Sequence, residues 1–280
     1  MLNEPGLTSR VEQGWELPLL VWRAERPLRA VSSAPLGGGL GTRGWVVNAT
    51  VPMSYRRDDP ADHLAELAAD LGLDGPGVGL LTGVDVADVV SRSESGVRVW
   101  ATVGLGLPIW AADPAADPAT TAGRATHPAA VPAGRAGRPS PGEGSRARPP
   151  APRVGTVNIV GYVPIRLTDA ALVNAVATAT EAKAQAIIGL GHPGTGTPTD
   201  AVTVLCPVDG PVADYGGPRS EWGALLARAV YAAVRAGGLA DRPPWSERAQ
   251  GRKPDRYPPS ERTGGQKSDR TVIVGPEIAR

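Results

Sequence analysis

The chain has 280 residues, which suits one large domain or two small ones. Its 36 glycines and 29 prolines make up about 23% of the chain, and aromatic residues only 4%, with no Phe. Any core must therefore consist of Val, Leu, Ile and Ala. A formal net charge of +1 argues against a nucleic-acid-binding polycation. The single Cys206 excludes an intramolecular disulfide and a multi-Cys zinc site. Without 18 consecutive apolar residues or a signal peptide at the polar start, we expect a cytoplasmic protein without a membrane span.

Two stretches lack the apolar residues that a folded core requires. Residues 113–152 hold nine Pro, eleven Ala and five Arg, with Val131 as their only branched aliphatic residue, and are predicted to be a disordered insert. Residues 241–280 are predicted to be a mostly disordered polar tail, in which 271–274 either adds an edge strand or stays loose. Residues 1–112 and 153–240 together then form a single domain.

The remaining segments alternate between strand and helix patterns. Strands are predicted at 45–51, 154–165 and 201–206, and the β-branched runs 78–84 and 97–103 are expected to pair as a hairpin. Helices are predicted at 62–71, from an N-cap at Thr168 to about 190, and at 220–236. The fold class is α+β (mixed α/β), with a central mixed sheet packed by helices.

The segment 168–200 carries the most pronounced polar pattern. Asn174, Thr178, Glu181 and Gln185 share one side of the predicted helix, while Lys183 points to the opposite side. The loop that follows contains four Gly, three Thr, His192 and Asp200. Such a loop brings backbone N–H groups and hydroxyls close to an oxyanion or a phosphate. The alternative is a solvated helix face followed by a flexible connector.

Two strands are interrupted by asparagine, a polar side chain that needs a partner when it is buried. Asn48 and Asn158 are either satisfied core residues or donors held at a site on rigid elements. His63 is expected on the solvent side of its helix, and Cys206 is expected to be a small buried group. His127 falls in the insert, so a three-His metal site is not expected.

The order of these motifs resembles the adenosylcobinamide amidohydrolase (CbiZ) family of corrinoid salvage. The matching segments are 32–39, 48–52, 59–64, 81–85, 155–159, 167–183, 194–202 and 216–218. The most specific of them are the Thr-Glu-Ala-Lys sequence at 180–183 and the Thr-Gly-Thr-x-Thr-Asp sequence at 195–200. The chain departs from the family in the insert and the tail, outside the motifs.

The resemblance implies hydrolysis of the amide that joins aminopropanol to a corrin side chain of adenosylcobinamide, giving adenosylcobyric acid and 1-amino-2-propanol. Amide hydrolysis needs an activated nucleophile, donors for the oxyanion and an acid for the leaving amine. From that chemistry we expect Glu181 or Asp200 to activate either a water or the Thr199 hydroxyl. The expected substrate-binding residues are Asn48, Asn158, Thr178, Thr195, Thr197 and His192.

The corrinoid brings its own cobalt, so no further cofactor is expected, although carboxylates leave room for a divalent metal. Trp45, Trp100 or Trp110 either packs on the corrin ring or belongs to the core. Two other functions stay open at this point: a non-catalytic corrinoid-binding protein of the same fold, and a phosphate-binding protein that uses the glycine-rich loop. The sequence does not indicate the oligomeric state.

Overall fold

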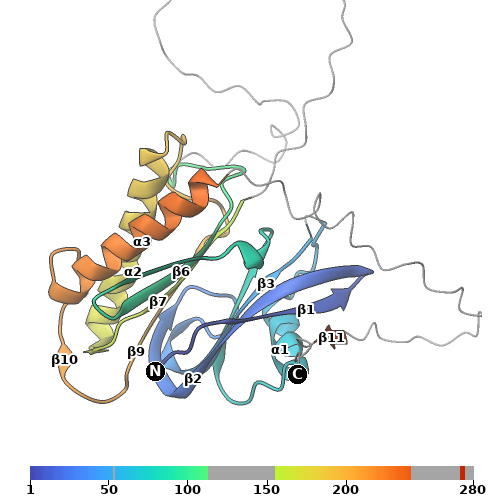
Figure 1. The fold of residues 1–280 in the computed structure, drawn as a ribbon, viewed down its shortest axis with the longest axis horizontal. Helices are drawn as coiled ribbons and strands as arrows, with labels where there is room; N and C mark the ends of the chain where they lie inside the picture. Colours follow the sequence, from blue (N-terminus) through green and yellow to red (C-terminus); the bar gives the residue numbers. More distant parts are fainter. Residues whose placement is uncertain (53, 113–154, 241–271, 275–280) are drawn as a thin grey trace, which may run out of the picture. The chain divides into compact units, whose positions relative to one another are not determined.

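The computed structural model describes residues 1–52, 54–112, 155–240 and 272–274 (Figure 1). The predicted insert and the predicted tail lie outside the described residues, apart from residues 272–274. The strands are β1 (Gly6–Glu12), β2 (Trp15–Ser32), β3 (Gly39–Thr50), β4 (Gly77–Thr82), β5 (Val90–Glu94), β6 (Val97–Val103), β7 (Val157–Tyr162), β8 (Arg166–Leu167), β9 (Ala201–Cys206), β10 (Val212–Ala213) and β11 (Val272–Val274). The helices are α1 (Pro60–Asp70), α2 (Asp169–Gly189), α3 (Glu221–Leu239) and the short 3-10 helix η1 (Val86–Asp88).

Nine of these strands form one mixed sheet, which confirms the predicted fold class. Its order is β11-β1-β2-β9-β7-β6-β5, with β3 on β2 and β4 on β3. The pairs β3–β4 and β7–β9 are parallel. The long strand β2 pairs with β1 through its first half and with β9 through its last residues, and it follows β3 past an irregularity between Arg23 and Leu28. Residues 272–274 pair with β1 at the edge of the sheet, the first of their two predicted alternatives.

The predicted hairpin between 78–84 and 97–103 is wrong. Strand β4 pairs in parallel with β3, whereas β6 forms its hairpin with β5 through a turn at Ser95 and Gly96. Both turn residues have positive φ, which suits a tight connection between two antiparallel strands. The downstream strand of the hairpin is the predicted one, and its upstream partner is β5 instead of β4.

The three helices are those predicted, and their first turns show why. Thr168 caps α2 by accepting a hydrogen bond from the Ala171 N–H at 3.2 Å, and Ser220 caps α3 in the same way through Gly223. Helix α1 starts at Pro60, where the missing N–H is no loss. Among the described residues, no helix is long and apolar enough to cross a membrane.

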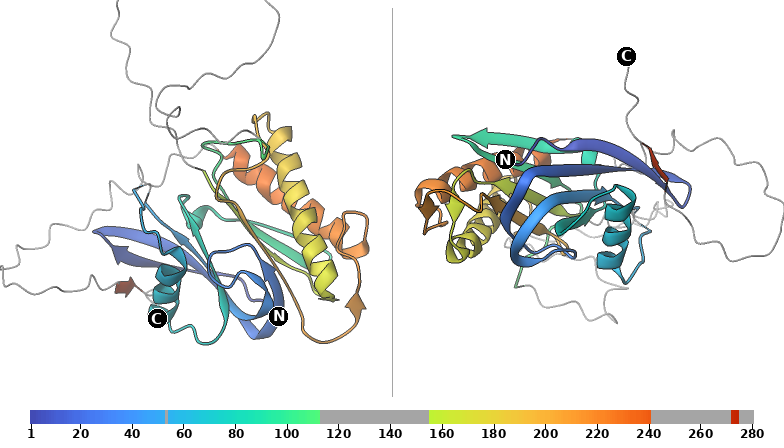
Figure 2. Two further views of the ribbon diagram at one scale, coloured as in Figure 1. Left: turned by 180° about the vertical axis from the view of Figure 1, so that it is seen from behind. Right: turned by 90° about the horizontal axis from the view of Figure 1, so that it is seen from below.

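Helices α2 and α3 cover one face of β6, β7 and β9, whereas α1 covers β3 and the first half of β2. Helices α2 and α3 lie side by side over β6, β7 and β9 (Figures 1 and 2), and their Ala, Leu and Val residues form the largest core cluster with those strands. Helix α1 packs Leu67 and Ala68 against β3 and the first half of β2. Cys206 is fully buried in the larger cluster, as expected.

A second core lies on the opposite face of β6, β7 and β9. It joins Trp100 and Val160 to Val46 and Leu80 of β3 and β4, although these strand pairs are not neighbours in the sheet. The sheet therefore curls until β3 and β4 face β6 and β7. Trp100 is 1% exposed and Trp45 6%, so both belong to the core.

Candidate active site

Asp200 lies directly before β9 and is the centre of a buried polar cluster. Its Oδ1 accepts hydrogen bonds from the Val157 N–H, at 2.8 Å, and from the Thr197 hydroxyl. Its Oδ2 accepts from the Thr197 N–H, at 3.0 Å, and from the Lys183 ammonium. An ionised carboxylate has about four acceptor positions, and here each has a donor. The Asp200 carboxylate therefore holds the loop in place and has no free position for a water molecule.

Lys183 reaches this cluster from α2, opposite to the polar stripe, as its helical position predicts. Its side chain is 8% exposed and that of Asp200 9%. Gly196 passes directly over the pair, since a Cβ there would lie 2.5 Å from Asp200 Oδ2 and 2.6 Å from Lys183 Nζ. The ion pair is thus closed in by the glycine-rich loop, which makes it a buried pair whose loss would leave an unpaired charge.

The glycine-rich loop is also joined to the segment that follows β6. The Ile109 N–H donates to the Gly196 carbonyl and the Thr195 N–H donates to the Ile109 carbonyl, both at 2.8 Å. Next to this bridge, Leu107 and Trp110 keep 43% and 41% of their surface exposed. An apolar surface therefore lies beside the hydroxyl-bearing loop.

Within the glycine-rich loop, Thr199 is the predicted catalytic residue that remains accessible. It is exposed, and its hydroxyl lies 2.7 Å from the hydroxyl of the buried Thr156. The contact with Thr156 orients this hydroxyl, and the anchored Asp200, the next residue, holds this part of the loop. The pair is a hydrogen-bonding group that a substrate can reach.

Asn48 and Asn158 meet in the second core, behind this loop. The Asn158 amide donates to Asn48 Oδ1 and to the Leu81 carbonyl, each at 2.9 Å, and the Asn48 amide donates to the Thr102 hydroxyl at 3.1 Å. Both asparagines are 1% exposed. They cross-link β3, β4, β6 and β7, which fits the satisfied-core alternative. Of the amide groups of these two asparagines, Asn158 Oδ1 is a buried atom that has no hydrogen-bond partner among the described residues.

Besides the two asparagines, three of the predicted site residues lie outside the Asp200 cluster. Glu181 is exposed, and two residues along a helix from Lys183 it points away from the loop. Thr178 is 1% exposed and donates to the Gly216 carbonyl at 2.8 Å, so it belongs to the packing of α2 rather than to the polar stripe. His192 is half-buried where the loop leaves α2.

A second polar cluster includes His63, and here the expectation of a solvent-side histidine is wrong. His63 is 2% exposed. Its Nδ1 lies 3.1 Å from the Tyr55 hydroxyl, and its Nε2 lies 3.4 Å from the Glu12 carboxylate. Arg10 donates to Glu12 through Nε at 2.9 Å and to the Thr50 carbonyl through Nη2 at 3.0 Å. The missed signal was strand β1, which brings Arg10 and Glu12 to α1.

Burial and neighbouring charges act in opposite directions on the titratable groups of this second cluster. Burial alone would raise the pKa of Glu12, but the hydrogen bond to His63 and the charge of Arg10 outweigh it and lower the pKa to about 2. Burial raises the pKa of Tyr55, although the charge of Arg57 opposes this. Glu12 is therefore ionised and Tyr55 carries its proton at neutral pH.

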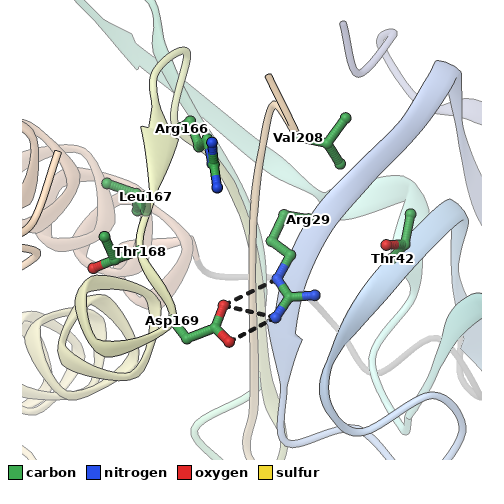
Figure 3. Close-up of a pocket in the computed structure, with 7 residues that line it drawn as sticks. All are labelled: Arg29, Thr42, Arg166, Leu167, Thr168, Asp169 and Val208. Carbon is green, nitrogen blue, oxygen red and sulfur yellow. Dashed lines mark hydrogen bonds and ion pairs between the residues drawn. The ribbon is translucent and has the colours of Figure 1, made fainter. Parts of the chain in front are cut away.

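A separate cavity of about 480 Å³ opens at the start of α2 (Figure 3). Figure 3 shows Arg29 of β2 facing Asp169, with which it forms an ion pair at 2.7 Å, while Arg166 lies across the cavity. None of the predicted site residues lines it. Within the described ranges, no group of three or more His, Cys, Asp or Glu side chains is arranged to hold a metal ion.

Comparison with known proteins identifies the family to which the chain belongs. The sequence profile of the adenosylcobinamide amidohydrolase (CbiZ) family matches residues 4–243. An adenosylcobinamide amidohydrolase of Methanosarcina mazei is 25% identical over 214 residues, which is 73% of this chain and 88% of that protein. Another from Halobacterium salinarum is 46% identical over 83 residues, or 29% of this chain and 35% of the relative. The profile match includes both polar clusters.

Proposed function

The chain belongs to the adenosylcobinamide amidohydrolase (CbiZ) family and is an amidohydrolase of corrinoid salvage, and from this premise we propose that it acts on adenosylcobinamide at the Thr199 loop. The bond broken is the amide between the corrin side chain and aminopropanol. Water adds to the carbonyl carbon, the C–N bond breaks, and the products are adenosylcobyric acid and 1-amino-2-propanol.

The fixed hydroxyl of Thr199 supports this place for the reaction. A tetrahedral intermediate is stabilised by donors that are already oriented before the reaction begins. Thr199 is exposed and oriented by Thr156, and the next residue is held by four hydrogen bonds. Thr199 then donates to the developing oxyanion, while Asp200, Thr197 and Lys183 keep the loop in one conformation. In this proposal Asp200 is a positioning residue.

The apolar surface beside the loop suits the other part of the substrate. The corrin ring is broad and largely apolar, with amides around its rim, so its site needs apolar area next to polar donors. Trp110 and Leu107 offer that area, and Thr195 and His192 of the adjoining loop offer polar groups to the rim. Trp45 and Trp100 are buried and do not contact the ring.

In this proposal no protein-bound cofactor takes part, and the cobalt belongs to the substrate. Glu181 lies on the solvent face of α2, and the acceptor positions of Asp200 are filled. The base that removes a proton from water must therefore come from another part of the molecule. We place the reaction in the cytoplasm, because its acid product re-enters the cell's own cobalamin synthesis.

The observation that carries this proposal is the family match over residues 4–243. Its test is incubation of the purified protein with adenosylcobinamide, followed by mass spectrometry of the corrinoid and of the released amine. Loss of the aminopropanol group from the corrinoid is expected. An unchanged corrinoid that co-elutes with the protein would instead identify a non-catalytic corrinoid-binding protein.

A further inference from the structure

A chain of hydrogen-bonding groups in the second cluster runs from Tyr55 through the buried His63 to the half-buried carboxylate of Glu12. Tyr55 is half-buried, and its ring stacks on that of His63 with centroids 5.6 Å apart. His63 and Glu12 lie deeper, with 2% and 15% of their side chains exposed. These three residues come from the β3–α1 connection, from α1 and from β1. Tyr55 is thus the member of this chain of groups that a substrate can reach.

The contacts determine which nitrogen of the imidazole is basic. Glu12 is ionised and can only accept, so the His63 proton lies on Nε2 and points to Glu12. Nδ1 then carries the lone pair and accepts from the Tyr55 hydroxyl. A carboxylate that orients an imidazole, which in turn accepts a proton from a hydroxyl, is the arrangement that activates hydroxyl groups in hydrolases.

Packing alone does not account for these residues. Burying a guanidinium, a carboxylate and an imidazole costs free energy that apolar side chains of similar volume would not. Arg10 is fully buried, and within the described part of the chain its Nη1 has no hydrogen-bond partner. A polar group left unpartnered at full burial indicates that the cluster does more than fill space.

This second cluster flanks the same end of β3 as the Asp200 cluster. Arg10 donates to the carbonyl of Thr50, the last residue of β3, and Asn48, two residues earlier, accepts from Asn158. The residue before Asn158 donates its N–H to Asp200. One short set of strand residues therefore separates the two clusters.

We propose that Tyr55, His63 and Glu12 form the acid–base relay of the amide hydrolysis, an inference that rests on the proposed function. As water attacks the carbonyl carbon, its proton passes to Tyr55 Oη while the Tyr55 proton passes to His63 Nδ1. Glu12 stabilises the imidazolium. When the carbonyl re-forms, the C–N bond breaks and its electron pair stays on nitrogen. The proton then returns from His63 through Tyr55 to the leaving amine, which restores all three groups.

The charges around His63 come from three elements. Glu12 and Arg10 face it from β1, Tyr55, Arg57 and Asp59 from the connection before α1, and Glu66 from α1 itself. Arg57 is paired with Asp59 at 2.7 Å and with Glu66 at 2.8 Å, so these three charges are largely compensated within their own network. Glu12 is the carboxylate in direct contact with the imidazole.

The test is the pH dependence of kcat and KM on adenosylcobinamide for wild type, Tyr55→Phe, His63→Gln and Glu12→Gln. A positioned acid–base group contributes about 10² to 10⁴ in rate, so Tyr55→Phe and His63→Gln should lower kcat by about 10² or more, with KM changed less than about threefold. Glu12→Gln should lower kcat less and displace the acidic limb of the profile. Tyr215→Phe, at a tyrosine 75% exposed, and Glu66→Gln are the matched controls.

The outcomes separate this inference from the proposed function. An active wild type whose Tyr55→Phe variant keeps its kcat and its pH profile overturns the relay alone. An inactive wild type overturns the proposed function and the relay with it. Should His63→Gln fail to fold, as judged by circular dichroism, Tyr55→Phe still decides, because its half-exposed side chain loses only the hydroxyl.

Discussion

Four donors converge on the Asp200 carboxylate, two on each oxygen, and this geometry separates the roles of neighbouring residues. Asp200 is fixed and enclosed, whereas the Thr199 hydroxyl beside it stays accessible. Glu181, on the same helix as Lys183, lies on the solvent face. Two carboxylates predicted for one role are therefore expected to behave differently when each is changed to its amide.

Asp200→Asn leaves the buried Lys183 ammonium without its counter-charge. Removing one partner of a buried ion pair costs about 3 kcal/mol or more, so the free energy of unfolding in urea should fall by that amount. The variant's kcat/KM should fall with it as the loop loses its fixed conformation. Glu181→Gln is the matched control, and a surface change of this kind should stay within about 0.5 kcal/mol. Equal effects of the two variants would contradict the assignment.

Thr199 is tested by keeping or removing its hydroxyl. Loss of one oriented oxyanion donor lowers kcat by about 10² to 10³, which is the effect expected for Thr199→Val. Thr199→Ser keeps the hydroxyl and should retain most of the activity in the same steady-state assay. Thr180→Val, on the exposed face of α2, serves as the control. A Thr199→Val variant with the wild-type kcat would remove Thr199 from the site.

The lowered pKa of Glu12 predicts that the free energy of unfolding depends on pH. Its folded pKa of about 2 lies below the ordinary value of 4.5, so the stabilisation is complete above pH 4.5 and is lost as the pH falls toward 2. The free energy of unfolding of wild type minus that of Glu12→Gln should therefore shrink by about 3 kcal/mol over this range. Denaturant titrations at pH 5, 4, 3 and 2 measure it. A difference that stays constant across them would contradict the lowered pKa.

At the scale of elements, the loop that carries Asp200 and the segment after β6 form one surface through their shared hydrogen bonds at Ile109. Trp110 presents its exposed ring on that surface. Trp110→Ala should raise KM for adenosylcobinamide by about tenfold while kcat stays within about threefold. The substitution removes the proposed apolar contact with the corrin ring of the substrate but removes no reacting group. A variant with unchanged KM would mean that the corrin ring lies elsewhere.

The helices and several central strands could be predicted because their signals are local. Caps at Thr168 and Ser220, Pro60 at a first turn and runs of β-branched residues all act within a few positions. Strands β1 and β2 were missed, since the 18 residues of β2 contain two prolines and an irregularity that interrupts its alternation. The parallel pairing of β3 and β4 is not local, which is why β4 was given to a hairpin.

In the candidate site, too, residues that are close in the sequence could be predicted together, whereas contacts between distant segments could not. Thr197, Thr199 and Asp200 were found together because they share one loop. The sequence places Lys183 opposite the polar stripe but does not identify its partner. A lysine on an otherwise apolar helix face needs a counter-charge, and Asp200 follows 17 residues later. Glu12 and His63 meet only because β1 pairs with β2 and α1 packs on the same sheet. No local pattern in the sequence predicts that contact.

At the scale of the whole molecule, the curled sheet brings two polar clusters to one end of β3, while α2 and α3 cover the far side of β6, β7 and β9 (Figure 2). Asn48 and Asn158 tie the facing strands between the clusters. The proposal therefore assigns the oxyanion donor to one cluster and the acid–base relay to the other, with the end of β3 between them. Side chains supply both.

Removal of metal ions tests whether those side chains suffice. Since the proposed relay and the oxyanion donor need no bound ion, kcat on adenosylcobinamide should be unchanged after treatment with EDTA and gel filtration. The assay is the same corrinoid turnover measurement, with untreated protein as control. Loss of activity that returns on adding a divalent metal would show that the reaction depends on a bound metal ion.

The central claim is that this protein hydrolyses the aminopropanol amide of adenosylcobinamide. The most direct test is a reaction in ¹⁸O-labelled water, with mass spectrometry of both products. We predict adenosylcobyric acid with one ¹⁸O in the new carboxylate and an equimolar amount of unlabelled 1-amino-2-propanol. Unchanged adenosylcobinamide after prolonged incubation, or an acid product without the label, would contradict the claim.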